Sequence, residues 1–86
     1  MHTVEVLRDA VATAERLGYT IREEWLGGVG GGACEFKGRK WIFLDSSLNP
    51  IEQLEQVCQA LREDPAIYLV DMPAHLRQLL DVRRSA

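Results

Sequence analysis

Apolar residues recur along this chain at two spacings, one typical of helices and the other of strands. Between Thr3 and Leu17 they fall on a single helical stripe, formed by Leu7, Ala10, Val11, Ala14 and Leu17. Gly18 follows, at the position where a glycine commonly ends a helix. From Tyr19 to Trp25 apolar and polar residues alternate, which predicts a half-buried strand after the first helix.

The segments 33–37 and 40–45 predict a β-hairpin closed by Gly38-Arg39. A glycine at the first position of a two-residue loop favours a type II′ turn. A turn at these two residues pairs Phe36 with Trp41 and Cys34 with Phe43, so these four residues share one face of the sheet. The segment 40–45 is apolar on both faces, so we expect it to be the central strand.

Two more helices are expected in the second half of the chain. Asn49 is a strong N-cap, Pro50 suits the first helical position and Glu52 can complete a capping box. This helix runs to about Glu63, and a third runs from Pro73 to about Arg83. The expected fold is one small α+β domain, residues 1–86, in the order α-β-β-β-α-α, with a three-stranded antiparallel meander packed against the helices.

Composition and charge narrow the functional classes. Hydrophobic residues make up 47% of the chain and charged residues 27%, a globular balance. The order α-β-β-β-α also occurs in the double-stranded RNA-binding fold, which grips phosphates with basic residues at the start of its last helix. That position is acidic in this chain, at Glu52 and Glu55, and the net charge is -3. We therefore expect no nucleic-acid partner.

The sequence also argues against a membrane-spanning or secreted protein. No apolar run approaches the roughly 20 residues that span a bilayer. The N-terminus lacks the basic and apolar regions of a signal peptide. We expect a cytoplasmic protein without a membrane partner, in which Cys34 and Cys58 stay reduced and fill apolar positions.

The side chains that could hold a metal or act as nucleophiles are scattered: His2, Cys34, Cys58 and His75. Structural zinc needs four ligands in tetrahedral reach, and no Cys-x-x-Cys or closely paired histidines are present. A cysteine nucleophile needs a nearby base, and both histidines lie far away in sequence. We expect no metal, no cofactor and no catalytic set.

The glycine-rich stretch 27–32 is the most unusual composition in the chain. One interpretation is a strongly bent connection between two strands. The other is a loop that contacts a ligand or a partner, with these candidate residues: Trp25, Gly27, Gly28, Gly30, Gly31, Gly32 and Arg39. The phosphate-loop pattern of strand, loop and helix is missing, because a second strand follows the glycines. Trp25 and Trp41 are expected in the core, with at most one of them reaching its edge.

The segment Gly38–Gln53 resembles the strand and helix start of the ImmA/IrrE-type zinc metallopeptidases. In that family a hairpin strand, a short turn and an acidic helix start precede a His-Glu-x-x-His zinc helix. Continuing the resemblance, the two histidines would fall on Gln59 and Glu63 and the glutamate on Ala60. The resemblance therefore implies a shortened relative without peptidase activity. The alternative explanation, which we favour slightly, is that these residues reflect only the ordinary chemistry of a strand, a capping box and a helix.

Three functions remain open from the sequence. The first is a non-enzymatic interaction domain with a protein partner, or one that self-associates as a homodimer, because a three-stranded sheet leaves edges exposed. The second is a small-ligand-binding protein that uses the loop 27–32. The third is a cysteine-dependent enzyme or redox sensor, which would need an accessible thiol of low pKa.

Overall fold

The computed structural model describes residues 2–80 and contains three α-helices, a 3₁₀ helix and a three-stranded sheet. In chain order the elements are α1 (Thr3–Arg16), β1 (Tyr19–Glu24), β2 (Gly32–Phe36), β3 (Arg39–Asp45), α2 (Pro50–Glu63), η1 (Pro65–Leu69) and α3 (Ala74–Leu80). The α+β class and the expected helices are confirmed. The predicted last turn at Arg83 lies outside the described residues.

The sheet is mixed, so the predicted antiparallel meander is wrong. The strand order is β1-β3-β2, with β1 parallel to β3 and β2 antiparallel to it. Glu24 ends β1 opposite Asp45, and Gly32 begins β2 opposite Phe43. The connection 25–31 therefore passes across the carboxyl end of β3 instead of turning back beside β1. This places β3 in the centre, as its apolar composition predicts.

The hairpin turn consists of Lys37 and Gly38, one residue earlier than expected. Both residues have positive φ, 51° and 76°, as a type I′ turn requires. Phe36 consequently pairs with Arg39, and Cys34 pairs with Trp41. A turn at Gly38-Arg39 would have paired Phe36 with Trp41 and Cys34 with Phe43, so the observed pairing is shifted by two residues from the predicted register. Because side chains alternate with a period of two, the predicted grouping of residues on each face is preserved.

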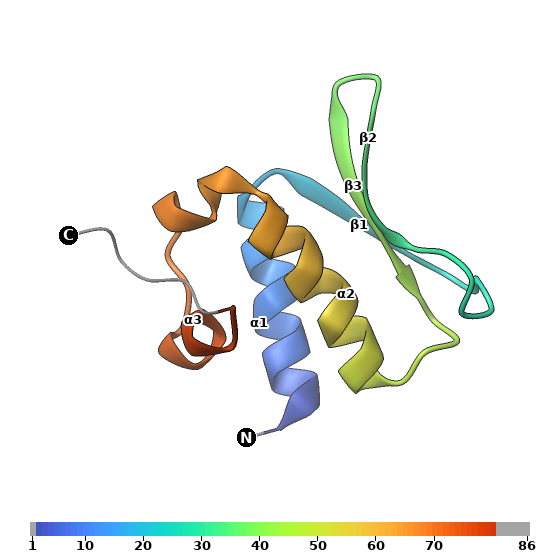
Figure 1. Cartoon of the computed structure of the whole chain (residues 1–86), viewed down its shortest axis with the longest axis horizontal. Helices are drawn as coiled ribbons and strands as arrows, with labels where there is room; N and C mark the ends of the chain where they lie inside the picture. Colours follow the sequence, from blue (N-terminus) through green and yellow to red (C-terminus); the bar gives the residue numbers. More distant parts are fainter. Residues whose placement is uncertain (1, 81–86) are drawn as a thin grey trace.

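Helices α1 and α2 lie side by side and pack against one face of the sheet (Figure 1). That face contributes Ile42 and Leu44 of β3 to a core that includes Ala10 of α1 and Leu61 of α2, each at most 2% exposed. The capping box at the start of α2 is confirmed. The Asn49 side chain accepts from the Glu52 backbone at 2.9 Å, and the Glu52 carboxylate accepts from the Asn49 backbone at 3.2 Å.

The short helix α3 is tied to α1 by polar contacts. His75 Nε2 lies 2.8 Å from an Asp9 carboxylate oxygen. Arg16 donates to the Asp71 carbonyl at 2.9 Å just before α3 begins. Leu76 and Leu80 are buried beneath these contacts and join the same core.

Candidate functional site

The glycine-rich connection is held by the last residue of the central strand. The Asp45 side chain is fully buried, and its two carboxylate oxygens accept from the backbone N–H groups of Leu26, at 3.0 Å, and Gly28, at 2.6 Å. Ser47 donates to the same carboxylate through its backbone, at 2.9 Å, and its hydroxyl, at 2.6 Å. One aspartate thus fixes both the loop and the turn into α2.

The Asp45 carboxyl group is a stronger acid than usual. Burial alone would raise the pKa of its carboxyl group, but hydrogen bonds from Ser47, Leu26 and Gly28 outweigh burial and lower the pKa to about 2. The carboxylate is therefore ionised near neutral pH. Two of the loop's N–H groups point at it, so they are already occupied and are not offered to a ligand.

The individual glycines have different structural roles. Gly31 has a φ of +108°, and a Cβ at this position would come within 2.6 Å of the Gln56 amide nitrogen and 3.0 Å of the Phe43 carbonyl oxygen. Gly27 lies against the Trp25 indole, whereas Gly30 has room for a Cβ and no positive φ. Gln56 also donates to the Gly30 carbonyl at 3.3 Å. These contacts favour the interpretation of the stretch as a strongly bent connection.

The candidate residues from the sequence do not form one cluster. Trp25 follows β1 beside the glycines and is 74% exposed, so its expected place in the core is wrong. Arg39 begins β3 next to the hairpin turn, at the opposite end of that strand from the loop. The β2–β3 hairpin alone separates them, because the glycines precede one end of β2 and Arg39 follows the turn at its other end.

A second candidate surface is the face of the sheet turned away from the core. Trp41 and Phe43 lie on it, with their rings stacked at 6.1 Å between centroids. Both are half-buried, and neither belongs to the core cluster or to the residues packed against it. Phe36 and Cys34 are exposed on the same face, so the expectation that Trp41 and Cys34 fill the core is wrong. We call this surface the open face. Cys58, in contrast, is buried as expected.

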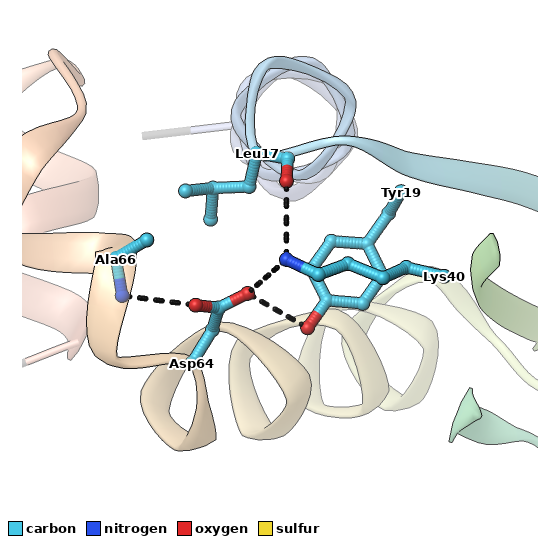
Figure 2. Close-up of polar contacts among 5 residues, drawn as sticks. All are labelled: Leu17, Tyr19, Lys40, Asp64 and Ala66. Carbon is cyan, nitrogen blue, oxygen red and sulfur yellow. Dashed lines mark hydrogen bonds and ion pairs between the residues drawn. The ribbon is translucent and has the colours of Figure 1, made fainter. Parts of the chain in front are cut away.

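Near the start of β1 and β3, a polar cluster connects these two strands with the end of α1 and the junction of α2 and η1 (Figure 2). Lys40 Nζ donates to an Asp64 carboxylate oxygen at 3.0 Å and to the Leu17 carbonyl at 3.3 Å. The Tyr19 hydroxyl donates to the same Asp64 oxygen at 2.9 Å, and the lysine nitrogen lies 4.9 Å from the centre of the Tyr19 ring. The other Asp64 oxygen accepts from the Ala66 backbone N–H in the first turn of η1, at 2.9 Å.

The protonation states of this cluster follow from its contacts. Burial raises the pKa of Tyr19 to about 12, assisted by the hydrogen bond to Asp64 and the negative charges of Asp64, Glu35 and Glu63. Burial alone would also raise the pKa of Asp64, but hydrogen bonds from Ala66, Lys40 and Tyr19 lower it. A neutral tyrosine and an ionised aspartate form a stable structural contact. Neither group is poised to exchange a proton near neutral pH.

We expect Tyr19→Phe to lower the free energy of unfolding by about 1 kcal/mol, because Asp64 loses one hydrogen-bond donor in a buried site. Urea denaturation measures this change. Tyr68→Phe is the matched control, since Tyr68 is 60% exposed and should tolerate loss of its hydroxyl. Equal effects of the two variants would contradict a structural role for the Tyr19 contact.

The residues that the metallopeptidase resemblance aligns with the two histidines and the glutamate of the His-Glu-x-x-His motif lie on one side of α2. Gln59, Ala60 and Glu63 line a cavity of about 270 Å³ between α2 and β2. Within residues 2–80, no group of three His, Cys, Asp or Glu side chains is arranged to hold a metal ion. None of the helices in that range is long and apolar enough to cross a membrane.

Comparison with known proteins gives no relative. No family model matches this sequence, and neither a curated protein nor a solved structure matches it. The resemblance to the ImmA/IrrE-type metallopeptidases stays a prediction. Functional inference therefore depends on the surfaces described above.

Proposed function

We propose that this chain is a non-enzymatic interaction domain that self-associates through the open face of its sheet in the cytoplasm. The supporting observation is the stacked pair Trp41 and Phe43, which lies outside the core and beside the exposed Phe36. Aromatic side chains are enriched at protein interfaces relative to the rest of the surface. The exposed free thiol of Cys34 suits a reducing compartment.

A second copy suits the open face because the face is self-complementary. Consider a twofold axis that lies in the interface, parallel to β3. It would stack Trp41 and Phe43 on the same residues of the partner. It would also place β1 of one copy opposite β2 of the other. Arg22 of β1 and Gly32 of β2 are both level with Phe43, so the long arginine would lie over a residue without a side chain. There it could contact the partner's aromatic rings.

We do not extend the proposal to ligand binding by the loop 27–32. Asp45 occupies the N–H groups of Leu26 and Gly28, and Gln56 occupies the Gly30 carbonyl. A ligand would have to displace contacts that hold the connection in place. The bent conformation of the loop accounts for its glycine content, and no bound molecule is needed to explain it.

The self-association proposal predicts a dimer of the wild-type chain at tens of micromolar in analytical ultracentrifugation. Thr20→Lys should weaken the dimer about tenfold or more, because the two added lysines would join the two Arg22 side chains and place four positive charges in one interface. Thr20 is an exposed residue of the open face, so the fold should survive. Gln78→Lys, at an exposed position on α3, is the control and should leave the dimer intact. A wild-type chain that stays monomeric up to its solubility limit would refute the proposal.

A further inference from the structure

A groove runs between the outer edge of β2 and helix α2, on the side of the sheet opposite the open face. In the part of the chain from 2 to 80, β2 pairs with β3 on one side and has no strand on the other. Two adjacent cavities of about 270 and 250 Å³ lie along this edge and share Ala33, Ala60 and Glu63 among their lining residues. An unpaired edge beside a hollow offers backbone hydrogen bonds to an additional strand.

The side of the groove formed by the sheet consists of small residues. Gly31, Gly32 and Ala33 line it on the side of the sheet. On α2 the lining residues are Gln56, Gln59, Ala60 and Glu63, whose spacing of three and four residues puts them on one helical face. Ala60 is small, and Gln59 and Glu63 are exposed. A strand placed beside β2 would therefore meet polar side chains from the helix.

The groove is negatively charged, which favours a positively charged segment. Glu35 of β2 and Glu63 of α2 both line the cavity beside Tyr19, and both raise the pKa of that tyrosine through their negative charge. Lys40 lines the same cavity, but its ammonium group is paired with Asp64. In the described residues neither Glu35 nor Glu63 takes part in an ion pair. The groove therefore carries an excess of negative charge.

We propose that this groove binds an extended, positively charged peptide segment, which adds a fourth strand to the sheet at the β2 edge. Backbone hydrogen bonds to β2 would supply sequence-independent affinity. Alternate side chains of the segment would point to the helix side, where lysine or arginine meets Glu35 and Glu63. A second copy of β2 is a poorer occupant, because it would bring the same two glutamates of both chains together.

Fluorescence anisotropy with a labelled heptapeptide of alternating lysine and threonine tests the proposal, with the glutamate–threonine peptide as the matched probe. We expect the lysine peptide to bind and the glutamate peptide to show no binding. In the double variant Glu35→Lys/Glu63→Lys the lysine peptide should bind about tenfold or more weakly than in the wild type. Both glutamates are exposed, so these variants should fold. Glu55→Lys is the control on another side of α2 and should leave affinity close to that of the wild type.

Three results would overturn the proposal. One is equal binding of the lysine and glutamate peptides, and another is unchanged affinity in the double variant. The third is equal binding of a lysine peptide whose alternate amides are N-methylated, because strand addition needs those N–H groups. Peptide binding uses the β2 edge, whereas self-association uses the open face, and the two are read by different measurements. Failure of one proposal is therefore distinguishable from failure of the other.

Discussion

Asp45→Ala is expected to lower the melting temperature of this domain by about 10 °C or more, the largest effect of any single substitution discussed for it. The variant removes the acceptor for the Leu26 and Gly28 backbone N–H groups and for both donors of Ser47. These groups lie in a part-buried region, where an unpaired donor is costly. Differential scanning calorimetry measures the change.

The control for this experiment is Asp71→Ala, which removes an exposed carboxylate just before α3. Its side chain is solvated, so the melting temperature should change little. If the two variants lose similar stability, the hydrogen bonds of Asp45 do not hold the loop. Asp45→Asn tests the charge more narrowly, because an amide can accept on one atom only.

The stability of the wild-type chain should also depend on pH through Asp45. The folded pKa is about 2 and the usual value is 3.8, so the unfolded chain binds the proton more readily. The contribution of Asp45 is therefore fully present above pH 4 or so and is lost as pH falls towards about 2. Asp45→Asn should show a flatter acid limb in urea denaturation than the wild type does.

Gly31→Ala is expected to lower the free energy of unfolding by about 2 kcal/mol, the second large effect. A φ of +108° is strained for alanine, and its Cβ would press on the Phe43 carbonyl oxygen and on Gln56. Gly30→Ala is the matched control in the same loop. Its φ is not positive and the nearest atom to its Cβ is 3.9 Å away, so stability should be unchanged or slightly increased.

Comparing Gly31→Ala with Gly30→Ala distinguishes two reasons for the glycines. One is a fixed backbone conformation that only glycine can adopt, and the other is flexibility of the loop. If flexibility alone mattered, alanine at either position would have a similar effect on unfolding measured in urea. A selective loss at Gly31 would show that the loop is fixed in one conformation beside Gln56. Similar effects of the two substitutions would contradict this structural explanation.

Much of the local structure was predictable from the sequence because its causes are local. The stripe in α1, the glycine after it and the capping box at Asn49 depend on residues within a few positions of one another. The faces of the β2–β3 hairpin were also predicted, although the turn was misplaced. A shift of two residues moves each pairing partner but leaves each side chain on its own face.

The candidate site was less predictable, and Trp25 and Asp45 show why. An aromatic residue at the end of an alternating segment suits a core, but its exposure depends on where the chain turns next. No local pattern distinguishes Asp45, because an aspartate is common at the end of a strand. Its importance comes from a loop about twenty residues earlier that returns to it in space.

By itself the sequence determined three helices, three short strands, a central third strand and an acidic, globular chain. These follow from periodicity, capping and composition, which act over short distances. Only the tertiary structure decided that β1 runs parallel to β3 and that the glycine connection crosses the strand end at Asp45. It also left Trp41 and Phe43 outside the core and opened the groove beside β2. These outcomes depend on which segments meet across the whole chain, and local patterns do not encode the choice of partner.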